Sequence, residues 1–321
     1  KVFNEQLPFI EEHRRQTTAL ELQVYESCLS SNRKKVAKQI GLSQSTVRDI
    51  FNRFAQTKVD HNRQLLTRVL GIDEISLKKR HKQFALVISD IERKCILTVL
   101  PDRSKDTLIK SLSQLSDQQR KAIKYVSIDM WTPYKEAVVK ELPEAKLVVD
   151  RFHVMKQLNE RISQIRRKIH KDTTDEAIKT ALKGSRWILV RNRAELSSRE
   201  TTKLNEILKL CPEIRTIYLL KEEYRFIFEK IEAKDKAERF LSAWKLKAMS
   251  TSNPFLMRFV KTLTNWWQYI LNYFFEKITN GFVEGLNGAI RNIIRRPFGY
   301  RNFRNFKLQV FAEQGFHNNR Q

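Results

Sequence analysis

The spacing of apolar and polar positions divides this chain into a helical beginning, a strand-rich middle and a long helical second half. Residues 1–31 carry apolar side chains at helix-packing intervals, and residues 34–54 predict two short helices on either side of a glycine. From residue 69 the pattern changes to short β-branched and apolar runs, which predict strands. Helical spacing returns over residues 154–278. The pattern therefore predicts an α/β region between two helical regions, with no internal repeat.

Five short apolar runs predict the strands of one sheet. The first three are separated by short polar turns, which predict antiparallel hairpins. A helix begins at Ser104 or Asp106, and the last two runs enclose a helix that begins around Thr132 and Pro133. A strand–helix–strand unit of this kind makes its two strands parallel. The strands are expected at residues 69–75, 83–89, 95–100, 125–128 and 146–149.

Three antiparallel strands followed by helix, strand, helix and strand is the element order of the ribonuclease H-like fold. We therefore expect an α/β ribonuclease H-like catalytic core with a mixed five-stranded sheet, interrupted by an all-α insertion and preceded by a helix-turn-helix. The expected divisions are a helix-turn-helix domain at 1–57, a linker at 58–68, the first part of the core at 69–153, the insertion at 154–278, and a Glu-bearing helix with a basic tail at 279–321.

Residues 34–54 have the spacing of a helix-turn-helix. Ala37 is small enough for close helix contact, Gly41 permits the turn, and Val47 would pack underneath. An ordinary three-helix bundle is the alternative. If the motif binds DNA, the outward side chains that would reach base edges are Gln44, Ser45, Thr46 and Arg48.

The formal net charge of +25, from 61 basic and 36 acidic residues, favours a polyanionic partner, with nucleic acid as the leading candidate. Ribosomal and membrane-surface proteins share such a charge, so it identifies no function by itself. Cys28, Cys95 and Cys211 are far apart in the sequence and form no CxxC motif, which argues against a disulfide framework or a thiolate zinc site. No signal peptide or membrane-spanning run is present, so we expect a cytoplasmic protein.

Acidic residues occur at places where they can meet. Asp73 lies in the first strand, Asp129 ends the fourth, and Glu284 belongs to an amphipathic helix over 279–296. Open α/β sheets place their chemistry at the carboxyl edge of the strands. Clustered carboxylates repel one another unless they share a cation, and two divalent ions about 3.5–4 Å apart serve phosphodiester chemistry. Oxygen ligands favour Mg²⁺, with Mn²⁺ as a substitute.

Four blocks of sequence carry a resemblance to a known family. The blocks are GIDEIS (71–76), SIDMWTPY (127–134), LPEAKLVVDRFHV (142–154) and NGFVEGLN with IRRPFGYRNF (280–303). With these blocks the chain resembles insertion-sequence transposases of the DDE type, most closely the ISL-three family, from about residue 30 to its end. The resemblance implies a bacterial source and a catalytic triad of Asp73, Asp129 and Glu284.

The same resemblance draws attention to further residues near the triad. Asp150 and His153 are similar to a family signature of Asp or Cys, two residues and His, although a structural role for His153 is equally open. Asn287, three residues after Glu284, also fits the family pattern. Its helical spacing places it with Glu284 and Arg291 on the outward face, opposite the apolar stripe. Family members typically carry a cysteine-rich, zinc-binding segment before the helix-turn-helix. This sequence has none and begins at Lys1, as expected if an N-terminal part is missing.

Other carboxylates compete with the proposed ligands. Glu276 and Glu313 are rivals for the third position, but neither has the sequence context of Glu284. Glu74 follows Asp73 directly and should point to the opposite face of the strand. Aromatic residues recur through the 154–278 helices, and we expect most of them in the core and a minority to stack on unpaired bases.

The resemblance implies DNA transposition. Hydrolysis at a transposon end would release a 3′-hydroxyl, which would then attack target DNA. The partner would be double-stranded DNA, as terminal inverted repeats and target, bound by at least a homodimer in the bacterial nucleoid. The alternatives are a transposase-derived regulator without catalysis, and a nuclease of the same fold that cuts without joining. Further DNA contacts are expected from Arg166, Arg167, Lys168, Arg291, Arg295, Arg296, Arg301 and Arg304.

Overall fold

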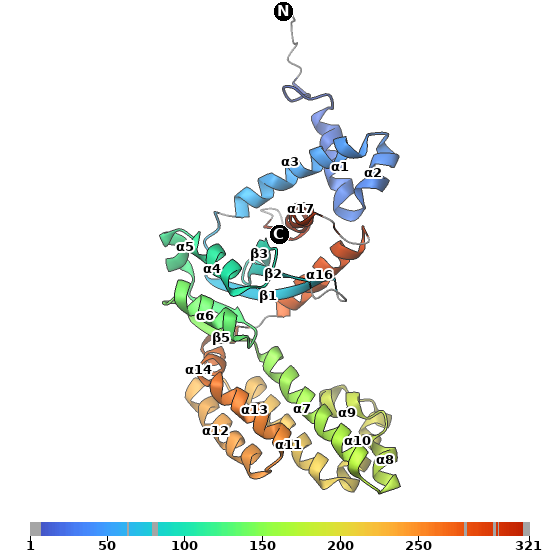
Figure 1. Ribbon diagram of the computed structural model, residues 1–321, viewed down its shortest axis with the longest axis vertical. Coiled ribbons are helices and arrows are strands. Elements are labelled where there is room, and N and C mark those ends of the chain that lie inside the picture. Colours follow the sequence, from blue (N-terminus) through green and yellow to red (C-terminus); the bar gives the residue numbers. More distant parts are fainter. Residues whose placement is uncertain are drawn as a thin grey trace, which may run out of the picture. The chain divides into compact units, whose positions relative to one another are not determined.

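The computed structural model describes residues 8–62, 64–78, 83–278, 281–297, 300 and 302–316 (Figure 1). The chain divides into two compact units, and each unit is assembled from separate stretches of sequence. Unit 1 comprises Lys1–Val126, Glu136–Ala145 and Asn280–Gln321, and unit 2 comprises Ser127–Lys135 and Lys146–Thr279. Over the part of the chain that the structure describes, no helix combines the length and the apolar content needed to cross a membrane.

Unit 1 contains the N-terminal helices, three strands and the two C-terminal helices. The strand β4 (Tyr125–Ile128) and the helix α6 (Thr132–Glu141) each have residues in both units. The elements that lie in unit 1 alone are α1 (Thr18–Ser30), α2 (Arg33–Ile40), α3 (Gln44–Asn62), β1 (Val69–Lys78), β2 (Gln83–Asp90), β3 (Cys95–Leu100), α4 (Lys105–Ser113), α5 (Asp117–Ala122), α16 (Gly281–Arg295) and α17 (Phe303–Gln314).

Unit 2 consists largely of helices, which follow the last strand of the sheet. Figure 1 shows α11, α12 and α13 side by side, and α13 also packs against α7. Its elements are β5 (Lys146–Val149), α7 (Arg151–Asp172), α8 (Glu176–Leu182), α9 (Arg186–Val190), the 3₁₀ helix η2 (Arg193–Glu195), α10 (Ser198–Leu210), α11 (Pro212–Lys230), α12 (Lys234–Ser250), α13 (Pro254–Asn265), α14 (Trp267–Leu271) and α15 (Tyr273–Glu276).

The five strands form one mixed sheet in the order β3-β2-β1-β4-β5. β1 pairs antiparallel with β2, and β2 pairs antiparallel with β3, as the short polar turns predicted. The register places Asp73 opposite Val87, and Val87 opposite Val99. The last three strands have the predicted bounds, whereas β1 continues to Lys78. The expected mixed five-stranded sheet is therefore confirmed.

The helix-turn-helix forms where the small, glycine and β-branched residues predicted it. Gly41 ends α2 in the left-handed conformation (φ 76°), which glycine adopts without steric cost, and its N–H donates to the Ala37 carbonyl. Ser43 Oγ then accepts from the Thr46 N–H at 3.1 Å at the start of α3. Ala37 and Val47 are both buried. The third helix continues to Asn62, into the stretch expected to be a linker.

One short helix of the α/β region was missed by the sequence interpretation. α5 begins with a capping box, in which Ser116 Oγ accepts from the Gln119 N–H and the Gln119 side chain accepts from the Ser116 N–H. The spacing of Ser116 and Gln119 is the signal that would have revealed it. The preceding helix, α4, is capped by Ser104 as expected.

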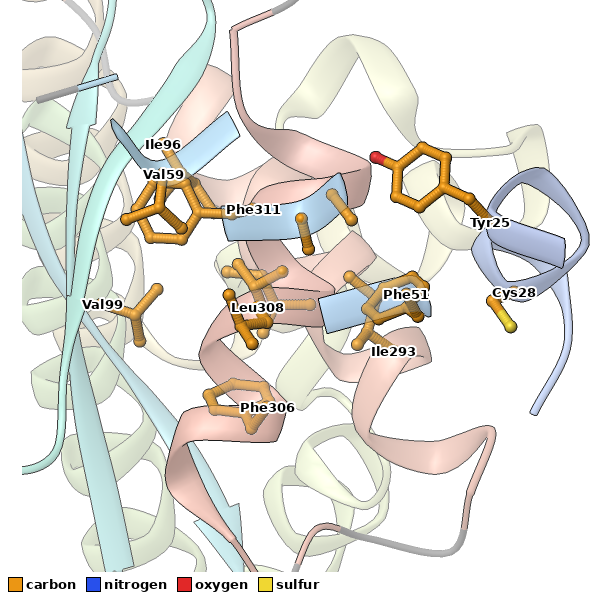
Figure 2. Packing of buried hydrophobic residues seen from close by; sticks show 14 of the residues in the cluster. Tyr25, Cys28, Phe51, Val59, Ile96, Val99, Ile293, Phe306, Leu308 and Phe311 are labelled. Carbon is orange, nitrogen blue, oxygen red and sulfur yellow. The ribbon is translucent and has the colours of Figure 1, made fainter. Parts of the chain in front are cut away.

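A single hydrophobic core joins the helix-turn-helix, the sheet and the C-terminal helices of unit 1. Figure 2 shows Phe51 of α3 together with Ile293 of α16, Leu308 and Phe311 of α17, and Val99 of β3. Arg296 adds polar links, because it forms a two-pronged ion pair with Glu313 and donates to the Leu29 carbonyl at 2.8 Å. The helices of the helix-turn-helix thus share one core with the sheet and the C-terminal helices, rather than being held by contacts among themselves alone.

The core of unit 2 is rich in aromatic rings. Most of the aromatic residues predicted to be core are buried, and Tyr224 contacts the rings of Phe228, Trp244 and Phe259. Lys221 is fully buried beside them. Its Nζ donates to the Leu189 carbonyl at 3.0 Å and to the Arg191 carbonyl at 2.9 Å, and pairs with Glu222 at 2.6 Å.

The buried Lys221 should make the stability of unit 2 depend on pH. Burial lowers the pKa of this ammonium from its ordinary value of 10.5 to about 8. Between these values the folded protein has lost the proton while the unfolded chain keeps it, so unfolding takes up a proton and stability rises with pH. Relative to Lys221→Met, the wild type should gain at most about 1.4 kcal/mol per pH unit between pH 8 and 10.

Urea unfolding followed by tryptophan fluorescence measures this effect, since all five tryptophans lie in unit 2. Subtracting the free energy of unfolding of Lys221→Met from that of the wild type cancels the contribution of groups that titrate equally in both proteins. A wild-type-minus-variant difference that stays constant from pH 7 to pH 10 would contradict the assignment.

Candidate active site

Asp73 is held by hydrogen bonds to both of its carboxylate oxygens. Oδ1 accepts from the Glu74 N–H at 2.7 Å, and Oδ2 accepts from Asn287 Nδ2 at 2.7 Å. Glu74 instead pairs with Arg103 at 2.7 Å, whose guanidinium lies over the Phe84 ring. The two neighbouring carboxylates therefore point to opposite faces of β1, as the strand alternation predicted. Of these two side chains, only that of Asp73 faces α16.

Asn287 corrects one part of the sequence interpretation. Its expected place on the outward face of α16, with Glu284 and Arg291, is wrong, because Asn287 is only 4% exposed. A carboxylate can only accept, so the amide nitrogen must face Asp73. The amide oxygen, Oδ1, is buried and receives no hydrogen bond from any described residue. A buried orphan acceptor beside a carboxylate is the arrangement that a bound cation or water would satisfy.

Glu284 lies one helical turn before Asn287 and is exposed. Residues three apart are neighbours on a helix surface, so Glu284 lies next to the amide that holds Asp73. Its two rivals have different surroundings. Glu313 is mostly buried and forms the ion pair with Arg296, and Glu276 is an exposed residue at the end of α15 in unit 2. Of the three, Glu284 is the one on the helix that Asn287 links to Asp73.

Asp129 is accompanied by His153 and Asp150 within unit 2. Asp129 follows β4, and its Oδ1 lies 3.3 Å from His153 Nδ1. The other imidazole nitrogen, Nε2, lies 3.9 Å from Asp150 Oδ2. Asp150 is buried and caps α7 by accepting from the Phe152 N–H at 3.2 Å. The cap fixes the first turn of α7, and this turn places His153 between the two carboxylates.

The oxygen donors are chemically suited to a hard divalent cation. Asp73, Glu284 and the free Oδ1 of Asn287 belong to unit 1, and Asp129 belongs to unit 2. Carboxylate and amide oxygens are the ligands that Mg²⁺ and Mn²⁺ prefer. Among the residues that the structure describes, no three or more His, Cys, Asp or Glu side chains gather closely enough to hold a metal ion. The chemistry of these donors nevertheless fits such an ion.

The side chains expected to contact base edges lie at the beginning of α3. Gln44, Ser45 and Arg48 are exposed there, whereas Thr46 is half-buried with its hydroxyl 2.8 Å from Ser43 Oγ. Arg48 pairs with the adjacent Asp49 at 3.2 Å. An exposed pair of this kind is weak and leaves the guanidinium accessible to another anion.

The basic residues expected to contact phosphates have varied surroundings. Arg166 is half-buried and donates to the Leu182 carbonyl at 3.1 Å, and Arg167 pairs with Glu160 at 2.9 Å. Arg296 holds the link to Glu313 described above. Arg301 lies outside the described residues. The side chains of Lys168, Arg291, Arg295 and Arg304 are exposed.

Two family models and two related proteins together match most of this chain. A family model described as a transposase matches residues 70–310, and a model described as the helix-turn-helix domain of transposase family ISL3 matches residues 5–55. The transposase for insertion sequence element IS1001 of Bordetella parapertussis is 28% identical over 310 residues, covering 96% of this chain and 76% of that protein. The transposase for insertion sequence element IS1557 of Mycobacterium tuberculosis is 26% identical over 318 residues, covering 92% of this chain and 71% of that protein.

Proposed function

This chain belongs to the ISL3 family of insertion-sequence transposases, and we propose that it cleaves transposon ends and joins them to target DNA through Asp73, Asp129 and Glu284. The sheet would then be a ribonuclease H-like catalytic core, with the helices of 154–278 as its insertion. The helix-turn-helix would bind the terminal inverted repeats. Because two ends must be joined, a dimer on DNA in the nucleoid is part of the proposal.

The observation that carries this proposal is the hydrogen bond from Asn287 to Asp73. It ties α16 to β1 and so brings the helix that bears Glu284 to the strand that bears Asp73. In the sheet order β4 is the neighbour of β1, and Asp129 follows β4 directly. These two links support the proposal that three carboxylates from separate parts of the sequence share one site.

Each residue has a distinct part in the proposed chemistry. When bound, Mg²⁺ ions, two per site and replaceable by Mn²⁺, would activate the attacking oxygen and stabilise the leaving one. Asp73 and Asp129 would hold these ions, and Glu284 would complete the set of ligands. Asn287 keeps Asp73 in one rotamer, and His153 does the same for Asp129, so the oxygens are positioned before DNA arrives. The basic side chains would neutralise phosphates and make binding strongly salt-dependent.

The decisive experiment is a cleavage and strand-transfer assay on labelled transposon-end DNA, with and without Mg²⁺. We expect metal-dependent nicking that leaves a 3′-hydroxyl, followed by joining to target DNA. Binding without metal-dependent cleavage would overturn the proposal in favour of a DNA-binding regulator. Cleavage that never proceeds to joining would identify a nuclease of the same fold.

Loss of His153 should weaken the reaction without abolishing it. His153→Ala removes the imidazole that lies between Asp129 and Asp150, and residues that orient metal ligands typically contribute about 10- to 100-fold in activity or metal affinity. We expect a cleavage loss in this range, together with a higher Mn²⁺ concentration at half-maximal rate. His153→Gln, which keeps one hydrogen bond donor, should recover part of the loss. An unchanged metal dependence in His153→Ala would mean that this residue has a structural role only.

A further inference from the structure

Unit 2 contains a cavity of about 910 Å³ that includes Asp129 and His153 in its lining. The opening residues of α7, the short helix α9, the 3₁₀ helix η2 and the end of α11 surround it. Its volume is within the range of about 300–1,000 Å³ typical of ligand pockets. The proposed chemistry uses Asp129 and His153 but leaves the rest of this cavity without a role.

Two aromatic side chains in the lining of the cavity are exposed. Phe152 is 49% exposed and Trp187 is 60% exposed, and both line the cavity. The guanidinium of Arg186 lies 4.9 Å from the Trp187 ring centroid. Large aromatic rings are normally buried, as most rings of this helical region are. An exposed indole in a cavity that also contains a proposed catalytic carboxylate is suited to a ligand with a flat face.

The backbone around Trp187 is held by buried neighbours and by hydrogen bonds, so the exposed side chain projects from a fixed position. Ile188 and Leu189, the next two residues of α9, are buried. Lys221 donates to the carbonyls of Leu189 and Arg191 at the end of the helix. At its beginning, Gly184 adopts φ 69° and the buried Ser185 hydroxyl donates to the Leu182 carbonyl at 2.8 Å. A ring presented by such a rigid element can receive a ligand at little entropic cost.

The charges of the cavity decide between two modes of nucleic-acid contact. Arginines line it, among them Arg151 and Arg225, but Glu195 and Glu229 line it as well. Acidic side chains among the basic ones make the cavity a poor channel for a continuous phosphate backbone. Base stacking needs no such excess of positive charge, and every base offers a π-face.

We propose that Trp187 and Phe152 stack on unpaired nucleotides at the DNA end and so hold the strand beside Asp129. This inference rests on the proposed function, because it assumes that a DNA end reaches Asp129. It adds a binding site for single-stranded nucleotides, which the triad and the helix-turn-helix do not provide.

Binding measured without divalent metal tests the inference separately from catalysis. The probes are transposon-end duplexes that are either blunt or carry a single-stranded overhang of about five nucleotides with 2-aminopurine. Trp187→Ala should weaken binding of the overhang probe by about 5- to 150-fold and leave blunt binding unchanged. The 2-aminopurine quenching seen with the wild type should be lost. Trp187→Phe should keep most of both signals, because it retains an aromatic face.

Phe226→Ala is the matched control. Phe226 is 52% exposed in the same unit but lies outside the cavity lining, so its loss should affect neither probe. Equal losses on blunt and overhang probes, or equal losses in the two alanine variants, would overturn the inference. A change in the oligomeric state of Trp187→Ala would overturn it too, by identifying a protein interface.

The two proposals fail in different ways. Trp187-dependent binding of overhangs by a protein that shows no metal-dependent cleavage would refute the transposase chemistry alone. Normal cleavage and joining with no dependence of overhang binding on Trp187 would refute the stacking site alone.

Discussion

Asp73→Asn should lower metal-dependent cleavage of transposon ends by on the order of a thousandfold or more, with DNA binding retained. The substitution keeps the shape of the side chain but removes the charge that the proposed cations need. It also places an amide opposite the Asn287 amide, where a carboxylate accepts a hydrogen bond at 2.7 Å. Single-turnover cleavage at saturating protein, with binding measured separately, gives the loss in the chemical step.

Glu74→Gln is the matched control for Asp73→Asn. Glu74 is the adjacent residue of β1, but it pairs with Arg103 on the other face. Partly exposed pairs contribute little, so cleavage should stay within about threefold of the wild type. Asp129→Asn and Glu284→Gln should match Asp73→Asn, and Glu276→Gln should match Glu74→Gln. If Glu284→Gln kept activity while Glu276→Gln lost it, the third carboxylate would be misassigned.

The sheet was predictable because its determinants are local. Short β-branched and apolar runs bounded by polar turns define strands whatever the rest of the chain does, and β3, β4 and β5 have the predicted bounds. The turn of the helix-turn-helix is similarly local, since Gly41 is suited to its left-handed conformation. Asp73 and Asp129 could be predicted as candidate metal ligands from the sequence, because Asp73 lies in a strand and Asp129 directly follows one.

The burial or exposure of three side chains could not be predicted from the sequence because it depends on tertiary contacts. The burial of Asn287 depends on a hydrogen bond to a residue 214 positions away, and a helical pattern alone places a polar residue outside. Lys221 is fully buried, although no charge pattern in the sequence predicts it. Trp187 has the spacing of a core residue, yet its neighbours Ile188 and Leu189 occupy the core in its place. In each case the position of another element sets the outcome.

Phe51→Ala should reduce the free energy of unfolding of unit 1 by about 3–5 kcal/mol. Phe51 is fully buried in α3, its ring lies 5.5 Å from that of Tyr25, and the Arg33 guanidinium lies 4.3 Å from its centroid. The same ring belongs to the core that contains Ile293 of α16. Truncation would leave a cavity where the helix-turn-helix meets the helix that bears Glu284.

Because the core is shared, the loss should affect the sheet as well as the DNA-reading helices. Urea unfolding followed by far-UV circular dichroism measures the change, and tryptophan fluorescence separates it from unit 2, where all five tryptophans lie. Phe9→Ala is the control, since Phe9 is 53% exposed in unit 1 and its loss should stay within about 0.5 kcal/mol. If Phe51→Ala weakened DNA binding but left unfolding of the sheet unchanged, the helix-turn-helix would be an independent module and the shared core would not be what stabilises it.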